Sequence, residues 1–113
     1  LLGGHVIITD DATVRVSDVE FDRLGQPGKL GRYPFHWHLM RDAAGTYLRR
    51  SSVHRSLQRG IIVHGTDGVE VADNVVYDVR GHGVYVEDGS ERGVTIARNL
   101  SALAQDVRPE HIL

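Results

Sequence analysis

The stretch Gly60-Ile61-Ile62-Val63-His64 returns later in the chain as Gly83-Val84-Tyr85-Val86-Glu87. The dipeptides Val53-His54 and Val76-Tyr77 are separated by the same interval. Each repeat consists of short runs of β-branched residues that are separated by turn residues, with no helical periodicity. A repeat of about 23 residues that is built from strands is typical of a parallel β-helix, in which every coil stacks on the coil before it.

A second pattern in the chain supports the same coil length. Short apolar segments recur along the chain and end at Val16, Leu48, Val71 and Ile96, and the last two of these intervals are close to the length of the first repeat. Three residues after the end of each of the last three apolar segments there is a Ser or an Asn, at Ser51, Asn74 and Asn99. Asn tolerates a left-handed backbone and can hydrogen-bond to its equivalent in the next coil, so we expect a ladder of polar side chains at this turn.

We therefore predict an all-β parallel β-helix with about 23–25 residues and three short strands in each coil. The main alternative is a leucine-rich repeat, but that class needs a Leu-x-x-Leu-x-Leu pattern which this chain lacks. An antiparallel sandwich is a further alternative, but it would not need a constant register between repeats. The longer interval from Val16 to Leu48 predicts a loop insertion at about 24–33, which Gly25, Pro27 and Gly28 mark together with Gly31.

The expected extent of the domain follows from the same repeats. The coils are expected to fill residues 1–105, and residues 106–113 to form an irregular exit segment. Neither end carries a recognisable cap, and uncapped coils expose strand edges. We therefore expect a fragment of a larger protein, whose open ends are covered by further β-helix coils or by another chain.

Composition excludes several classes of function. The chain has 113 residues, a net charge of −2 and no long basic run, which argues against a nucleic-acid partner. No apolar run approaches the ~20 residues that span a bilayer, so we expect no membrane contact by this segment. The absence of cysteine excludes disulfides and thiolate metal ligands, whereas seven histidines suggest chemistry at imidazole groups.

The alternation of side chains along a strand places three of these histidines on one face. Val63 and Val86 point into the core, as does Trp37, which is therefore not expected to be a sugar platform. The opposite face carries two columns of residues, Ile7, His36, Ile62 and Tyr85 in one and Thr9, His38, His64 and Glu87 in the other. Because neighbouring strands lie about 4.8 Å apart, we expect the second column to form an exposed ladder.

This ladder predicts acid–base chemistry or metal binding. Imidazole and carboxylate groups transfer protons near neutral pH, and both bind Zn²⁺ and other divalent ions. The candidate catalytic residues are His38, His64, Glu87 and His36. The candidate ligands of a divalent metal ion are His38, His64 and Glu87. The alternative is that these are solvated polar side chains on an outer face.

Arginines and aromatic residues near this column predict a binding site for an acidic glycan. Four arginines gather in one coil, at Arg49, Arg50, Arg55 and Arg59, and arginine binds carboxylates through two parallel hydrogen bonds. The alternative is that they are ordinary surface charges. The candidate substrate-binding residues are Arg32, Arg59, His82, Tyr85 and Asp88.

One segment of the chain resembles a known family. Residues 30–39, Leu-Gly-Arg-Tyr-Pro-Phe-His-Trp-His-Leu, are similar to a segment in the β-helix region of cell-migration-inducing hyaluronidases, transmembrane cell-surface hyaluronidase and fibrocystin-like proteins, which are associated with G8 domains. Further segments match in order, at residues 19–26, 52–56, 63–65, 73–78, 81–83 and 86–89. The chain departs from the animal pattern at Gly60 and Gly83, where those relatives often have Cys, which leaves a bacterial homologue open.

The resemblance implies a right-handed parallel β-helix in an extracellular or cell-surface protein. Some members of the family are associated with hyaluronan depolymerisation and others are not. The resulting hypothesis is a module that binds or depolymerises an acidic, uronate-containing polysaccharide, as a glycosidase or a polysaccharide lyase. Two alternatives remain open, namely a non-catalytic carbohydrate-binding or spacer module and a scaffold that a metal ion stabilises.

Overall fold

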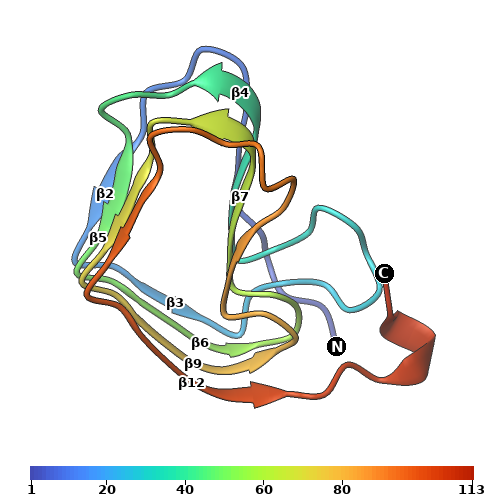
Figure 1. Ribbon diagram of the computed structural model, residues 1–113. Coiled ribbons are helices and arrows are strands. Elements are labelled where there is room, and N and C mark those ends of the chain that lie inside the picture. Colours follow the sequence, from blue (N-terminus) through green and yellow to red (C-terminus); the bar gives the residue numbers. More distant parts are fainter.

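The computed structural model describes residues 1–113 and forms a parallel β-solenoid of three sheets, each with four strands (Figure 1). The first sheet contains β1 (Ile7–Ile8), β4 (Phe35–Asp42), β7 (Ile61–Asp67) and β10 (Val84–Val86). The second sheet contains β2 (Arg15–Ser17), β5 (Tyr47–Arg49), β8 (Glu70–Ala72) and β11 (Thr95–Ala97). The third sheet contains β3 (Glu20–Asp22), β6 (Ser52–Ser56), β9 (Val75–Arg80) and β12 (Leu100–Gln105).

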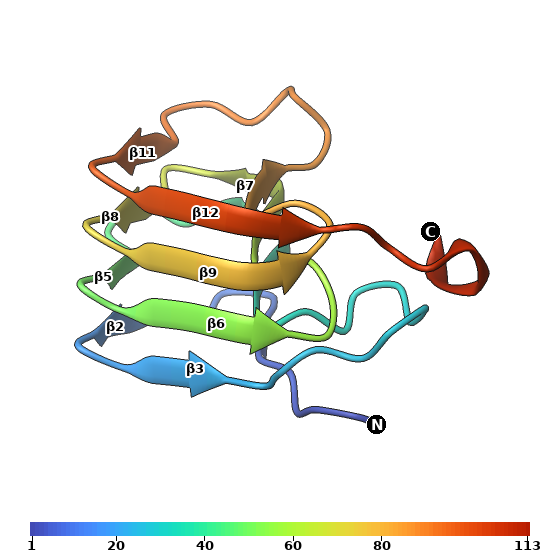
Figure 2. The ribbon, with the colours of Figure 1, turned by 90° about the horizontal axis from the view of Figure 1, so that it is seen from below.

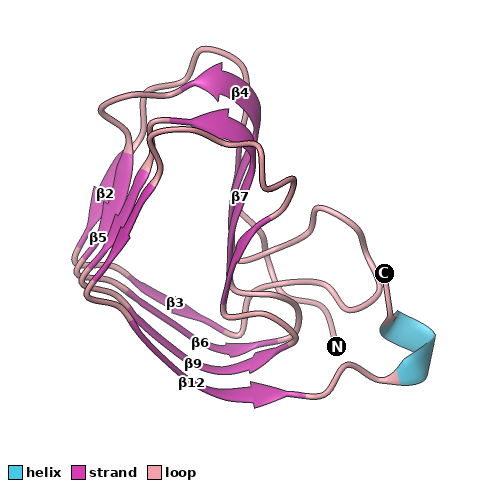
Figure 3. Cartoon of the chain, in the orientation of Figure 1, coloured by secondary structure: helices cyan, strands magenta, loops and turns pink.

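Every strand pairs in parallel with its equivalent in the next coil (Figure 2). Val84 pairs with Ile61 in the first sheet, as the repeat in the sequence predicts, and Thr95 pairs with Glu70 in the second sheet of the same two coils. The prediction of a parallel β-helix is therefore confirmed, and an antiparallel sandwich is excluded. The only helix is the short 3-10 helix η1 (Pro109–His111) near the C-terminus (Figure 3), and no helix is long and apolar enough to cross a membrane.

The core fills the space between the three sheets with β-branched and aromatic side chains. Trp37 and Val63 are fully buried, as the predicted alternation of side chains requires, and Leu48 on β5 is fully buried as well. The Phe35 and Trp37 rings pack edge to face with centroids 4.7 Å apart. Because each coil contributes large side chains to the same cluster, the coils stabilise one another by hydrophobic burial.

The turn between the second and third sheets repeats in each coil. The predicted polar ladder is present, because the Ser51 N–H donates to Asn74 Oδ1 at 3.0 Å and Asn74 Nδ2 donates to Asn99 Oδ1 at 3.0 Å. The left-handed residue is not the Asn, however, but the residue before it, as in Asp73 with φ of 58° and Arg98 with φ of 54°. The side chain of Asn74, which follows, is buried and forms hydrogen bonds along the stack.

Residues 23–34 form no strand and leave the solenoid between β3 and β4, as Figures 1 and 3 show. Gly25, Gly28 and Gly31 in this loop have φ of 91°, 64° and 78°, a region that glycine reaches without steric cost. The loop returns toward the outer side of the first sheet, where Tyr33 and Ile62 are fully buried. The predicted exposure of this face is therefore wrong at His36 and Ile62, which are buried, whereas Ile7 and Tyr85 in the same column keep exposed surface.

Candidate functional site

The first sheet brings His38, His64 and Glu87 together in successive coils. His38 and His64 are paired across β4 and β7, and their Nδ1 atoms are 3.1 Å apart. Glu87 follows β10, and its Oε2 atom lies 3.7 Å from His64 Nδ1. The three side chains therefore stack as the register predicts, and a catalytic role for them stays a prediction.

His36 is placed differently from the sequence-based expectation, because only 1% of its surface is exposed. The ring of Tyr33, brought in by the loop, packs against it edge to face at 4.9 Å. The His36 Nδ1–H donates to the carbonyl oxygen of Gly31 at 3.1 Å, whereas the buried Nε2 has no partner. Burial lowers the pKa of His36 to about 4, partly opposed by the hydrogen bond to Gly31, so the imidazole is neutral near pH 7.

A groove of about 250 Å³ lies between the loop and the first sheet. Its lining consists of Ile7, Leu30, Gly31, Tyr33, His36, His38, His64 and Glu87. His38, His64 and Glu87 are half-buried on its floor, rather than fully exposed as predicted. The loop is the physical reason, because it raises a wall beside an otherwise open sheet face and shields these polar groups from bulk water.

Two further carboxylates, those of Asp88 and Glu91, lie near the turn that follows Glu87. Asp88 Oδ1 is 3.5 Å from His64 Nε2, so this imidazole stands between Glu87 and Asp88. Glu91 fixes the turn that carries both, because its Oε1 accepts hydrogen bonds from the N–H groups of Gly65 at 2.9 Å and Asp88 at 3.2 Å. Burial raises the pKa of Glu91, but the backbone donors outweigh this effect and the net shift is downward.

Sequence reasoning missed the positioning role of Glu91. The only available signal was its place in a glycine-rich turn, Gly89-Ser90-Glu91-Arg92-Gly93, which is where a carboxylate often caps backbone donors. The role of Tyr33 as a cover for His36 was equally hidden, because it depends on the path of the loop.

Arg59, Tyr85 and His82 form a second group beside the groove. The guanidinium carbon of Arg59 lies 5.0 Å from the centre of the Tyr85 ring and 5.9 Å from the Tyr33 ring, within the range of cation–π contacts. The His82 ring stacks on Tyr85 at 4.5 Å. Tyr33 joins this group to the histidines, because it contacts both Arg59 and His36.

Arg32 stands apart from the other candidate binding residues. Its side chain is exposed on the loop, and its backbone carbonyl accepts a hydrogen bond from the Gln26 N–H at 2.9 Å, which closes the loop. The structure therefore gathers Arg59, Tyr85 and His82 into one group near the groove and leaves Arg32 outside it.

Three of the four arginines in the predicted cluster form ion pairs with carboxylates of neighbouring coils. Arg49 binds Glu70 through two hydrogen bonds of 2.8 and 2.7 Å, and the guanidinium groups of Arg50 and Arg55 are held in the same way. Their partners are Asp18 and Asp22. These three arginines form ion pairs between coils, which favours the alternative of ordinary surface charges for them, and a glycan-binding role for the cluster stays a prediction.

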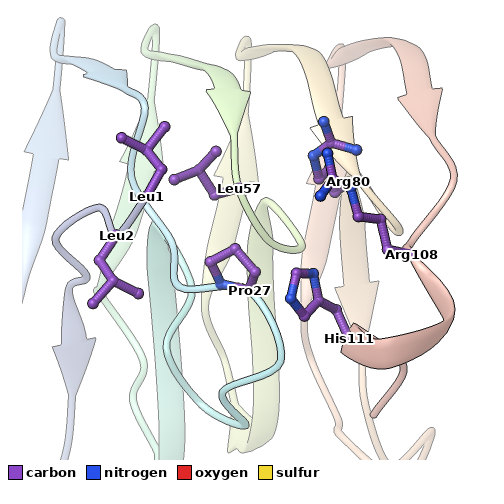
Figure 4. Close-up of a pocket in the computed structure, with 7 residues that line it drawn as sticks. All are labelled: Leu1, Leu2, Pro27, Leu57, Arg80, Arg108 and His111. Atoms are coloured by element: carbon purple, nitrogen blue, oxygen red, sulfur yellow. The ribbon is translucent and has the colours of Figure 1, made fainter.

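A separate hollow of about 380 Å³ lies between the loop and the C-terminal segment (Figure 4). Its lining consists of Leu1, Leu2, Pro27, Leu57, Arg80, Arg108 and His111. It contains one imidazole and no carboxylate, so it lacks the paired acid and base groups of the histidine groove. The groove beside His38 and His64 is therefore the better candidate for chemistry.

Comparisons with known proteins place this geometry in a family context. The family described as "CEMIP beta-helix" matches residues 1–111. The human protein named Cell surface hyaluronidase CEMIP2 is 38% identical over 111 residues, which cover 91% of this chain and 8% of that protein. Mouse Fibrocystin-L is 38% identical over 97 residues, which cover 85% of this chain and 2% of that protein.

A third relative extends the range of organisms. A G8 domain-containing protein of Dictyostelium discoideum is 37% identical over 105 residues, which cover 93% of this chain and 7% of that protein. The chain therefore corresponds to a small part of each of these relatives. No solved structure shows a significant match to this chain.

Proposed function

Because this chain belongs to the CEMIP beta-helix family, we propose that it binds an acidic, uronate-containing polysaccharide in the histidine groove and takes part in its depolymerisation. The name of the relative Cell surface hyaluronidase supports this choice of substrate class, and also a location outside the cell or at its surface. The observation that carries the proposal is the position of Arg59 beside the groove. Arg59 takes part in none of the ion pairs of the structure, unlike Arg49, Arg50 and Arg55.

The surroundings of Arg59 suit a sugar that carries a carboxylate. The guanidinium offers hydrogen-bond donors in a plane, and a uronate carboxylate matches that geometry. The half-exposed Tyr85 ring is stacked on the exposed ring of His82, and this aromatic pair offers an apolar edge and outer surface to the C–H face of a pyranose ring. A glycan lying across Arg59 and Tyr85 would bring its next unit toward the groove.

The groove supplies groups that transfer protons. Glu87 lines the groove 3.7 Å from His64, so a glycosidic bond bound in the groove would lie among a carboxyl group and imidazoles that can transfer protons. The proposal assigns Glu87 as the principal acid–base residue, with Asp88 beside it. Hydrolysis and elimination both require such a group, and both remain part of the proposed reaction class.

A second candidate function is a non-catalytic carbohydrate-binding or spacer module. The observation that favours it is that Fibrocystin-L, whose name states no activity, matches this chain as well as the hyaluronidase does. In either case we propose that residues 1–105 form the coils, with residues 106–113 as an exit segment, and that further coils or another chain continue the solenoid.

The test uses the full-length protein that contains this chain and hyaluronan oligosaccharides as the probe. We expect wild-type protein to bind hyaluronan more tightly than a neutral glycan, and to shorten it. Arg59→Gln should weaken hyaluronan binding at least tenfold, because the carboxylate loses its partner. Glu87→Gln should keep the binding and lose the depolymerisation.

The matched control is Arg50→Gln, which makes the same change of charge at a turn away from the groove. It should leave both binding and depolymerisation unchanged. Absence of hyaluronan binding in the wild-type protein, or equal losses for Arg59→Gln and Arg50→Gln, would overturn the binding proposal. Binding without any depolymerisation by the wild-type protein would establish the non-catalytic candidate instead.

A further inference from the structure

The buried nitrogen of His36 is the feature that the proposed function leaves unexplained. His36 Nε2 is buried and has no hydrogen-bond partner, while Nδ1–H is held by the Gly31 carbonyl. That hydrogen bond fixes the tautomer, so Nε2 carries a lone pair that points away from the loop. A backbone carbonyl on one ring nitrogen is the usual support for an imidazole whose other nitrogen binds a metal ion.

The two neighbouring histidines complete a set of ligands. One ring nitrogen from each of His36, His38 and His64 lies within 4.8 Å of the other two. The closest pair, His38 Nδ1 and His64 Nδ1, is 3.1 Å apart. A tetrahedral Zn²⁺ ion with Zn–N bonds of about 2.0–2.1 Å holds its ligand nitrogens about 3.3 Å apart, so this pair already has the required spacing.

A hydrogen bond between His38 and His64 does not account for the whole arrangement. Such a bond needs one N–H and one lone pair, and it still leaves His36 Nε2 buried without a partner. A metal ion among the three rings uses one lone pair from each and leaves none unsatisfied. Buried polar atoms without partners are rare in folded proteins, which favours the second arrangement.

We propose that His36, His38 and His64 bind a divalent transition-metal ion, with Zn²⁺ as the best-suited ion and its fourth position open to the groove. Three neutral imidazoles suit Zn²⁺, whereas Ca²⁺ and Mg²⁺ require oxygen ligands. This set replaces the sequence-based ligand set, because His36 takes the place of Glu87. Glu87 then stands beside the open position, 3.7 Å from His64 Nδ1, and stays free to move a proton.

The site would also explain why the loop covers His36. Tyr33 and Gly31 exclude water from one side of the ligands, and a dry, fixed imidazole binds an ion without having to be reordered. His38 and His64 are half-buried, which leaves a path for the ion from the groove. The inference does not depend on the proposed glycan, because ion binding concerns only the chain's own side chains.

The test measures metal uptake by the full-length protein without any glycan. The protein is stripped with a chelator, dialysed against Zn²⁺ and analysed for metal content, and its affinity is measured against a chromophoric chelator. We expect one Zn²⁺ ion per chain at this site, and absorption bands of a four-coordinate ion when Co²⁺ replaces Zn²⁺. His38→Gln and His64→Gln should each lower the Zn²⁺ affinity at least a hundredfold.

The matched control is His54→Gln, because His54 is also half-buried but lies on β6 and contacts Glu20 at 2.6 Å. This variant should keep the full Zn²⁺ affinity. His36→Gln tests the buried ligand, and its folding is checked by circular dichroism. If that variant unfolds, the His38→Gln and His64→Gln results decide the question.

Two results would overturn the proposal, namely no uptake of Zn²⁺ or Co²⁺ by folded wild-type protein, and uptake that survives both His38→Gln and His64→Gln. The glycan proposal fails or succeeds separately. Arg59→Gln should weaken hyaluronan binding and leave the Zn²⁺ affinity unchanged. A protein that binds Zn²⁺ but not hyaluronan would support the proposed metal site and refute the proposal of glycan binding.

Discussion

Asn74 is a single buried side chain that joins neighbouring coils. Its Oδ1 accepts the N–H of Ser51 at 3.0 Å, and its Nδ2 donates to the carbonyl oxygen of Leu48 at 2.9 Å. Its Nδ2 and backbone N–H both donate to Asn99 Oδ1. The side chain thus satisfies backbone groups that the turn would otherwise leave unpaired in the interior.

We expect Asn74→Ala to destabilise the protein by about 2–4 kcal/mol, because at least two buried backbone groups lose their partners. Urea unfolding that is followed by circular dichroism measures this change. Asn99→Ala should cost less, since Asn99 is half-buried and water can reach part of its surroundings. Equal and small losses for the two variants would contradict a structural role for the ladder.

Gly60 is a second position where one residue controls the spacing of coils. A Cβ atom at this position would collide with the carbonyl oxygen of Gly83 in the next coil, which is a backbone atom and cannot rotate away. The position therefore requires glycine because of close approach, not because of its backbone angles.

Gly60→Ala is expected to destabilise the protein by about 1–3 kcal/mol, the usual cost of overpacking. Gly4→Ala serves as the control, because nothing lies within 4 Å of a Cβ at that position. The control should stay within about 0.5 kcal/mol of wild type, as most surface substitutions do. The midpoint of urea unfolding distinguishes the two variants, and an unchanged midpoint for Gly60→Ala would show that the coils can separate to admit a methyl group.

At the scale of elements, ion pairs tie the turns and strands of adjacent coils together. Arg55 on β6 binds Asp22 on β3, and this hydrogen bond lowers the pKa of the Asp22 carboxyl group below its usual value. A carboxyl group whose pKa is depressed by folding stabilises the folded state above its unfolded pKa. That contribution is lost as the pH falls through the lower folded pKa.

We therefore expect Arg55→Gln to be less stable than wild type at pH 7, and the difference to disappear as the pH falls through the lowered pKa of the Asp22 carboxyl group and that group becomes protonated. Chemical unfolding at a series of pH values measures the gap between the two proteins. Both groups are exposed, so the gap should also shrink in high salt. A gap that stays constant from pH 7 to pH 2 would refute the role of the pair.

The strands and their register were predictable because the sequence patterns identify, for most strands, the equivalent strand in the next coil. Val63 aligns with Val86 at an offset of 23 residues, whereas His38 aligns with His64 at an offset of 26 residues, so the pairing of the two histidines rests on a separate alignment of residues 35–38 with residues 61–64. The ion pairs between coils could also have been predicted from the register. Arg50 follows Asp18 by 32 residues, which is the interval that separates Leu48 from its partner Val16.

The path of the loop at residues 23–34 could not be predicted from the sequence. Its glycines predict a departure from the solenoid but not the direction of its path, which depends on the packing of Tyr33 against His36. For that reason His36 was assigned to an exposed face, and its buried, unpartnered Nε2 was not foreseen. Non-repeating segments carry no internal copy against which their conformation can be checked.

At the scale of the whole molecule, the four-coil solenoid ends in unpaired strands. β11 and β12 form the last rung of their sheets, and the exposed apolar residues of that rung include Ile96, Leu100 and Leu103. Unpaired parallel edges with exposed apolar side chains are templates for further strands. The proposal that more coils or another chain cover this end follows from that surface.

We expect residues 1–113, produced alone, to associate as the protein concentration rises, and sedimentation velocity would detect this. Leu100→Lys on the edge strand should reduce the association, because an edge lysine disfavours pairing with another strand. Val75→Lys is the control, since Val75 is also exposed but lies on β9, which is paired with a strand on both sides. A chain that stays monomeric at every concentration would contradict the expectation.

The coil-to-coil pairing also determines how the molecule responds to mechanical load. The hydrogen bonds between β3, β6, β9 and β12 run along the stacking direction, whereas the covalent backbone runs across it (Figure 2). Tension along the stack would therefore open the terminal coil first and then each following coil, because a coil contacts only its neighbours. Tension across the stack would be carried by peptide bonds. Such a solenoid would be compliant along its stacking axis and stiff across it. Under a stretching force along that axis it would unfold in steps of one coil.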